Sequence, residues 1–238
     1  MTRAELYRRL PLTSADRWWV ELARRSADGR VLELGAGSGR LSRALVAEGV
    51  EVVAVERDPA MLAALHEQVG GAVTIVDADV TELGDLGRFG VVVMPASLLN
   101  ELATPGDRAA TIARAAAACR SDGVVGMQLL GPWWLAALPA TSMGHLVPAD
   151  GSPPIEVVVD AAALDAWSGR RRATLTYRFD DGEMMRDHLD AAVVTPTELS
   201  AALDAAGLTM MEVWGVEPGV TPLTAGDTVW HVLAQPRS

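Results

Sequence analysis

The chain has 238 residues, half of them hydrophobic, and a formal net charge of −11, and all twenty of its basic residues are Arg. This length predicts one domain with an insertion, the absence of Lys excludes Schiff-base chemistry, and the single cysteine, Cys119, excludes an internal disulfide. The acidic balance disfavours nucleic acid as a partner, because phosphate binding requires a basic surface. No apolar run reaches the ~20 residues that span a bilayer and no signal-peptide pattern follows Met1. We therefore expect a cytoplasmic protein without a membrane partner.

Helical and strand patterns alternate over the first 130 residues. Helical spacing covers residues 6–26, interrupted by Pro11, and Thr13 or Ser14 can cap its second part. Short apolar strands are predicted at residues 30–34, 50–56, 73–76, 90–94 and 124–130, and helices at 41–48, from Pro59 onward with Asp58 as its cap, and at 107–120. Apolar strands that alternate with amphipathic helices predict a doubly wound α/β domain, whose ligand crevice lies at the carboxyl ends of the strands.

The pattern changes after Leu130. Residues 131–154 are rich in Gly and Pro and predict a loop with at most a short helix. Segments 156–160, 172–179 and 183–194 alternate apolar and polar residues, and Asp180-Asp181-Gly182 is typical of a hairpin turn. A helix at 197–206 and strands at 208–216 and 228–234 then complete a mostly parallel, Rossmann-like sheet of seven strands. We expect a single domain, 1–238, with a helical lid at 1–28 and an antiparallel lid insertion at 131–194 over the active site.

A glycine loop follows the first strand. Residues 33–39 read Glu-Leu-Gly-Ala-Gly-Ser-Gly, with the spacing Gly-x-Gly-x-Gly rather than the Gly-x-Gly-x-x-Gly that accommodates a pyrophosphate. Glu33 precedes the first glycine by two residues and would repel a pyrophosphate. Its charge suits the ammonium and sulfonium groups of S-adenosylmethionine, since a pair of unit charges ~4 Å apart is worth roughly 4 kcal/mol at an effective dielectric near 20.

Two further acids follow the next strands. Glu56 ends the second strand, where a carboxylate can accept both ribose hydroxyls of a nucleoside. Asp79 follows the third strand, where its carboxylate can accept from an adenine amino group while Val80 offers a backbone N–H. Asp77 fits this role less well, and a loop-stabilising role for Asp79 stays open.

These motifs together resemble a known family. Segments 31–40 and 53–62 resemble the first two motifs of class I S-adenosylmethionine-dependent methyltransferases, and 77–80 resembles their adenine motif. Residues 90–95 resemble the family's fourth strand, and residues 196–213 resemble its terminal helix and strand. Residues 120–125 resemble its "R-P-G-G" turn, with Ser121 and Asp122 in place of Pro and Gly. The resemblance covers about residues 30–130 and 190–235, and it implies S-adenosylmethionine as cofactor, S-adenosylhomocysteine as product and no metal.

The resemblance also implies a set of cofactor-binding residues. At the methionine end, the loop residues Glu33, Gly35, Ala36 and Gly37 line the methionine moiety, and Met94 and Pro95 lie against it. At the nucleoside end, Glu56 holds the ribose, Arg57 and Met61 flank the adenine, and Asp79 and Val80 bind the adenine edge. Tyr7 closes over the cofactor.

The acceptor side is less defined by the sequence. A general base is needed only if the acceptor must first lose a proton. Glu101 lies in Asn100-Glu101-Leu102, where relatives carry Asn-His-Leu, so the role of that His does not transfer directly. The candidate catalytic residues are Glu101, His145 and Tyr177, and the candidate substrate contacts are Trp18, Trp133, Trp134, His145 and Tyr177.

The leading hypothesis is a methyltransferase, monomeric or homodimeric, that modifies O, N or C of a small molecule such as a secondary metabolite. One alternative keeps the fold and cofactor but uses them for cyclisation or other non-methylating chemistry. An NAD(P)-dependent oxidoreductase and a non-catalytic binding module are the remaining alternatives, and the glycine spacing with Glu33 disfavours the oxidoreductase.

Overall fold

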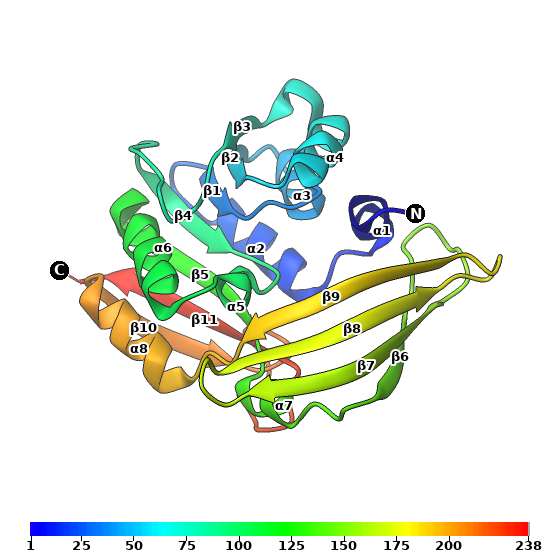
Figure 1. The fold of residues 1–238 in the computed structure, drawn as a ribbon. Coiled ribbons are helices and arrows are strands. Elements are labelled where there is room, and N and C mark those ends of the chain that lie inside the picture. The colour runs from blue at the N-terminus through cyan, green and yellow to red at the C-terminus, as the bar shows by residue number, and fades with distance from the viewer. Residues whose placement is uncertain (238) are drawn as a thin grey trace.

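A seven-stranded sheet forms the centre of the computed structural model, which describes residues 1–237 (Figure 1). Its order is β10-β11-β5-β4-β1-β2-β3. The strands are β1 (Arg30–Leu34), β2 (Glu51–Glu56), β3 (Thr74–Asp77), β4 (Phe89–Met94), β5 (Cys119–Leu130), β10 (Leu208–Trp214) and β11 (Val229–Pro236). Strands β1 to β5 pair in parallel, and β11 runs antiparallel to both β5 and β10. The predicted doubly wound, mostly parallel sheet is confirmed.

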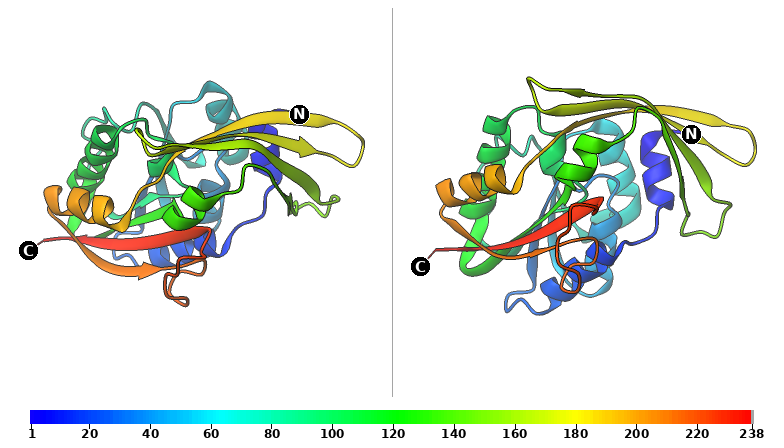
Figure 2. Two further views of the ribbon diagram at one scale, coloured as in Figure 1. Left: turned by 60° about the horizontal axis from the view of Figure 1, so that its bottom comes forward. Right: turned by 90° about the horizontal axis from the view of Figure 1, so that it is seen from below.

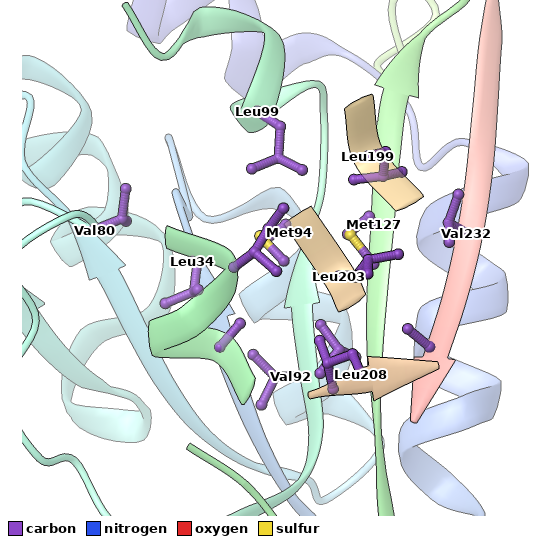
Figure 3. Close-up of a cluster of buried hydrophobic side chains, with 14 of the residues drawn as sticks. Leu34, Val80, Val92, Met94, Leu99, Met127, Leu199, Leu203, Leu208 and Val232 are labelled. Carbon is purple, nitrogen blue, oxygen red and sulfur yellow. The ribbon is translucent and has the colours of Figure 1, made fainter. Parts of the chain in front are cut away.

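Helices cover both faces of this sheet. The cluster on one face joins apolar residues of α2 (Ser14–Arg24), α3 (Arg40–Ala47) and α4 (Pro59–Val69) to alternate strand positions such as Val31 and Val52. The other cluster joins α5 (Leu98–Glu101), α6 (Pro105–Ala118) and α8 (Pro196–Ala205) to the intervening positions. Figure 3 shows Leu34, Met94 and Met127 of the strands packed near Leu199 and Leu203 of α8. Because neighbouring strand residues point to opposite faces, continuous apolar strands fill both clusters.

Side chains fix the helix starts where the sequence indicated them. The Thr13 hydroxyl accepts from the Asp16 N–H, and the Asp16 carboxylate accepts from the Thr13 N–H, which completes a capping box on α2. Asp58 accepts from the backbone N–H groups of Ala60 and Met61 at the start of α4. The expected caps are thus confirmed, and α4 is oriented from the end of β2. A short 3₁₀ turn, η1 (Gly70–Ala72), follows α4.

A second sheet is inserted between β5 and α8. It is antiparallel, in the order β6-β7-β8-β9, and consists of β6 (Ser142–Leu146), β7 (Ile155–Asp165), β8 (Arg170–Arg178) and β9 (Met184–Ala192). A hairpin at Gly182, with a positive φ of 86°, joins β8 to β9 as expected. The insertion therefore has the predicted antiparallel form.

Two local predictions are wrong. Residues 131–154 contain α7 (Pro132–Ala137) and also the strand β6, which lacks apolar alternation and is held by backbone pairing with β7. Residues 120–123, expected as a turn after a helix, extend β5 instead, because Cys119 already pairs with Phe89. Gly123 permits this pairing, since a Cβ there would stand 2.7 Å from the Gly90 carbonyl oxygen.

The N-terminal helix α1 (Arg3–Arg9) lies beside α4, between that helix and the inserted four-stranded sheet (Figures 1 and 2). Leu6 is fully buried in a cluster with Ile155, Tyr177 and Met185 of the insertion. The terminal ammonium of Met1 also pairs with Glu183. Docking against the insertion thus holds a helix too short to be stable alone. Among residues 1–237, no helix combines the length and apolarity needed to cross a membrane.

Candidate active site

A cavity of about 420 Å³ lies where β1, β2 and β4 end, beneath α1. Its walls come from the glycine loop, the end of β2, the start of α4, the segment after β4, and α1 and α2. The lining residues include Arg3, Tyr7, Asp16, Glu33, Gly35, Ala36, Gly37, Arg40, Glu56, Arg57, Met61, Ala78, Val80, Pro95, Leu98 and Glu101. Most of the expected cofactor residues therefore meet at one cavity, at the edge where parallel sheets bind ligands.

The glycine loop turns sharply between β1 and α3. Gly35, Gly37 and Gly39 all have positive φ, a conformation that residues with a Cβ rarely adopt. Gly35 is also crowded, because a Cβ there would stand 2.9 Å from Leu98 Cδ1. The Gly35 and Ala36 N–H groups donate to the Val55 carbonyl at 2.9 and 3.0 Å, which anchors the loop to β2.

Glu56 connects the end of β2 to this loop. Its Oε2 accepts from the Gly37 N–H at 2.8 Å, and its Oε1 accepts from the N–H groups of Arg57 and Asp58, each at 2.8 Å. These hydrogen bonds hold the carboxylate at the cavity wall. A carboxylate oxygen has more than one lone pair, so it can still accept from a hydroxyl in the cavity.

Glu33 lies at the base of the cavity on β1 and is only 1% exposed. Its Oε2 accepts from the Ser42 hydroxyl, whereas Oε1 has no hydrogen-bond partner among the described residues. Burial raises the pKa of the Glu33 carboxyl to about 8, and the Ser42 hydrogen bond opposes this effect. An unpaired buried carboxylate oxygen is a favourable contact for a cationic donor.

The adenine side of the cavity is formed differently from the expectation for Asp79. Its Oδ1 accepts from the Thr81 N–H at 2.8 Å and hydroxyl at 2.7 Å, and its Oδ2 pairs with Arg57. These hydrogen bonds, those from Thr81 first, lower the pKa of the Asp79 carboxyl. Asp79 therefore stabilises its loop, while its neighbours Ala78 and Val80 line the cavity.

Tyr7 and Met61 close the cavity from two helices. Met61 of α4 packs with Ala4 and Ala64, and Tyr7 of α1 packs against this cluster. The Arg3 guanidinium lies 5.3 Å from the centre of the Tyr7 ring. Met94, by contrast, is fully buried in the core rather than at the cavity wall, because it points to the face covered by α8 (Figure 3). Its neighbour Pro95 lines the cavity.

Glu101 is the acceptor-side candidate that reaches the cavity. It ends α5, a helix that begins just after Ala96 and Ser97, two non-glycine residues with positive φ of 50° and 67°. Arg3 Nη2 lies 3.6 Å from Glu101 Oε1, and Arg3 Nε lies 3.3 Å from Asp187 Oδ2 of β9. Desolvation by the surrounding protein raises the pKa of the Glu101 carboxyl, and the positive charge of Arg3 partly opposes this effect.

The other acceptor-side candidates lie elsewhere. Trp18 packs edge-on against Trp19 and Trp214 and does not line the cavity. Trp133 of α7 is 47% exposed, and Trp134 packs against Leu138 in a separate cluster.

His145 and Tyr177 belong to the inserted sheet. His145 is exposed on β6, where it pairs with Glu156 of β7. Tyr177 is buried against Leu6, and burial raises the pKa of its hydroxyl. Neither lines the cavity described here, so the structure does not bring these two candidates together with Glu101.

Sequence reasoning missed four charged residues of the cavity wall: Arg3, Asp16, Arg40 and Asp58. Asp16 stands in a capping box, and this local role hid its position in the cavity. Arg40 Nη2 lies 3.3 Å from Asp16 Oδ2. No group of three or more His, Cys, Asp or Glu side chains that could hold a metal ion occurs in the part of the chain that the structure describes.

Comparison with known proteins agrees with this geometry. Residues 31–123, which carry the glycine loop and Glu56, match the family "Methyltransferase domain". Residues 31–123 are therefore similar to a methyltransferase domain. The matched segment spans β1 to the start of β5, so it contains most of the cavity wall.

Individual relatives cover different parts of the chain. The ribosomal RNA small subunit methyltransferase A of Anaeromyxobacter sp. (strain K) is 45% identical over 74 residues, which is 30% of this chain and 26% of that protein. The chain thus spans about a quarter of the length of this curated relative.

Two solved structures match nearly the whole fold. The CcbJ methyltransferase of Streptomyces caelestis has a TM-score of 0.83 at 21% identity, covering 99% of this chain and 96% of its own. The S-adenosylmethionine-bound amino pentose methyltransferase CalS10 of Micromonospora echinaspora has a TM-score of 0.72 at 20% identity, covering 97% and 95%. The methyltransferase fold therefore includes the inserted antiparallel sheet.

Proposed function

We propose that this protein transfers a methyl group from S-adenosylmethionine to O, N or C of a small molecule. The observation that carries the proposal is a single cavity that combines the strained glycine loop, Glu56 at its wall and the buried Glu33 with an unpaired oxygen at its base, within residues 1–237. Its volume of about 420 Å³ falls in the usual range for small-molecule sites.

The two ends of the cavity suit the two ends of the cofactor. On the nucleoside side, Glu56 would accept from the ribose hydroxyls, and Arg57, Met61 and Val80 would contact the adenine. On the amino-acid side, Glu33 with Gly35, Ala36 and Gly37 would contact the methionine moiety, and Tyr7 and Pro95 would close over it. The Gly-x-Gly-x-Gly spacing and Glu33 disfavour the pyrophosphate of NAD(P), and therefore an oxidoreductase.

S-adenosylmethionine supplies an activated methyl group on a positively charged sulfur. The residues of this chain then have to bind, orient and exclude water, because positioning provides most of the rate in such a displacement. The glycine loop and the two glutamates would orient the donor. Tyr7, Pro95 and Leu98 would separate the reacting groups from solvent.

Glu101 is the residue that we propose as proton acceptor. It lines the cavity, and its raised pKa makes it a stronger base than an ordinary glutamate. A protonated amine would first lose its proton to this carboxylate, which frees the nitrogen lone pair for attack, whereas a hydroxyl would lose its proton during the attack. A sugar N-methyltransferase among the similar structures supports nitrogen as the acceptor atom.

A small molecule is the partner that the site supports. The ribosomal RNA methyltransferase match is confined to 74 residues, 30% of this chain, whereas the two structural matches cover nearly the whole chain, insertion included. The net charge of −11 also disfavours an RNA substrate.

Calorimetry tests the cofactor, with S-adenosylmethionine, S-adenosylhomocysteine and NAD as separate ligands. We expect binding of the first two and none of NAD. Binding of NAD alone would contradict the proposal. Incubation with methyl-labelled cofactor and a panel of amino sugars, alcohols and activated carbon acids then tests transfer, and turnover without label in the product would support non-methylating chemistry instead.

A further inference from the structure

Two buried carboxylates line the same cavity from different elements. Glu33 on β1 is 1% exposed and Asp16 on α2 is 0% exposed. Within residues 1–237, Glu33 Oε1 and Asp16 Oδ1 have no hydrogen-bond partner. Burying such an oxygen without a donor is costly. Both atoms are therefore available to a donor that enters the cavity.

The second oxygen of each carboxylate is fixed by the protein. Asp16 Oδ2 accepts from the Thr13 N–H at 2.8 Å and hydroxyl at 2.9 Å, and lies 3.3 Å from Arg40 Nη2. Glu33 Oε2 accepts from the Ser42 hydroxyl. Each side chain is thus held by one oxygen and presents the other. Once both carboxylates are ionised, Arg40 offsets one of the two negative charges, so one remains for a cation.

We propose that Asp16 and Glu33 together bind the α-ammonium group of the methyl donor, and that Glu33 releases a proton when the donor binds. This inference rests on the proposed function. An ammonium group has three N–H donors and one positive charge, which match two free oxygens and one uncompensated charge. Asp16 becomes a cofactor-binding residue beyond its capping role.

Proton release follows from the surroundings of Glu33. Burial raises the pKa of its carboxyl to about 8, Asp16 of α2 and Glu56 of β2 act in the same direction, and Ser42 and Arg40 of α3 oppose them. At pH 7 the ligand-free carboxyl is therefore mostly protonated. A cation beside it favours the charged form, so the proton passes to solvent on binding. Affinity rises with pH until Glu33 is fully ionised in the free protein.

Calorimetry with S-adenosylhomocysteine measures this proton directly. Titrations at pH 7 in phosphate and in Tris differ in apparent enthalpy in proportion to the protons released to the buffer. We expect release approaching one proton in the wild type and close to none in Glu33→Gln. Binding by the wild type with no proton release at pH 7 would overturn the coupling.

A matched pair of variants tests Asp16. Asp16→Asn should weaken S-adenosylhomocysteine at least about tenfold, the usual scale for a hydrogen bond to a charged group. Asp107→Asn removes the charge from an equivalent capping box, Thr104 with Asp107 on α6, and should leave the affinity unchanged. Methylthioadenosine, which lacks the amino-acid moiety, should bind all three proteins equally.

The outcomes separate the two proposals. Equal loss of affinity for both ligands in Asp16→Asn would mean that Asp16 only supports α2, and would overturn the ammonium site. Unchanged affinity for S-adenosylhomocysteine in that variant would overturn it too. Failure of the wild type to bind either ligand would instead contradict the proposed function.

Discussion

At the scale of single residues, Glu56 holds two backbone segments of the site in place. Its two oxygens accept from three backbone N–H groups, one in the glycine loop and two at the start of the α4 segment. One side chain thus joins two loops that are contributed by successive βα units. The same carboxylate faces the cavity, so its structural and ligand-binding roles are combined in one position.

Glu56→Ala should weaken S-adenosylhomocysteine binding by at least ~1 kcal/mol, because charge-assisted hydrogen bonds to the ribose are lost. Calorimetry measures the change. Glu51→Ala, at the exposed start of the same strand, is the matched control and should bind normally. An unchanged affinity in Glu56→Ala would remove this residue from the proposed site.

Glu33 should make stability depend on pH. Its carboxyl has a pKa of about 8 in the folded protein against an ordinary value of 4.5, so the folded state holds a proton that the unfolded state has lost. The contribution to stability is complete below pH 4.5 and falls as pH rises to about 8, by roughly 1.4 kcal/mol per pH unit.

Denaturant unfolding of wild type and Glu33→Gln at several values between pH 5 and 8.5 tests this dependence. The free energy of unfolding of the wild type should fall more steeply with pH than that of the variant, because glutamine does not titrate in this range. Parallel curves would show that the buried carboxyl does not titrate in that window.

Glu101→Gln should lower the rate of methyl transfer by ~10² or more while the affinity for S-adenosylhomocysteine stays the same, as expected for a general base. With an acceptor that shows transfer, the rate of the wild type should rise with pH through a pKa above that of an ordinary glutamate, and this rise should vanish in the variant. A change confined to the acceptor KM would assign Glu101 to binding instead.

At the scale of elements, α2 depends on a glycine in the neighbouring strand. Trp19 is 1% exposed and packs over β5, where a Cβ on Gly126 would stand 2.3 Å from the Trp19 ring. Trp18 points to the other side, against Trp214. Two adjacent residues of a helix cannot both point at the sheet that the helix covers. The space above Gly126 accommodates the Trp19 ring.

Gly126→Ala should destabilise the protein by ~1–3 kcal/mol, because the added methyl group overpacks the contact between α2 and β5. Gly144→Ala is the control: it lies on β6 with nothing within 4 Å of an added Cβ, and should be neutral or slightly stabilising. Thermal and denaturant unfolding report both. Equal stability of the two variants would show that Trp19 can shift without cost.

At the scale of the whole molecule, the roof of the cavity is assembled from distant parts of the chain. Arg3 of α1 lies near both Glu101 and Asp187, and Arg9 Nε lies 3.3 Å from Asp150. Leu6 adds an apolar contact with the inserted sheet. The N-terminal helix, which lines the cavity, is thus held against the inserted sheet.

The overall charge makes a separate prediction about RNA. A protein with a net charge of −11 should not retard a ribosomal RNA fragment in a mobility-shift assay, even at about 50 mM salt, where electrostatic binding is strongest. A shifted complex that weakens as salt is raised would contradict this and would revive the RNA acceptor of the relatives that share the cofactor segment.

Local sequence patterns were sufficient to predict much of the fold. The parallel strands, their helices and the hairpin at Gly182 were predictable because apolar periodicity, caps and turn residues act over a few neighbours. The strand β6 was not, because it lacks apolar alternation and is held by backbone pairing with the next strand, β7. The early start of β5 was not, because it depends on the pairing of Cys119 with Phe89 of β4 and on a glycine contact across the sheet.

The same division applies to the cavity. The glycine loop, Glu33 and Glu56 lie near one another in sequence and carry the methyltransferase resemblance, so residue order alone identified that wall. Asp16 with its unpaired oxygen, Arg3 beside Glu101, and the outward positions of Trp133 and His145 emerged only from tertiary structure. Packing between segments far apart in the chain sets which charges are buried and which side chains face the ligand, and no local pattern encodes that choice.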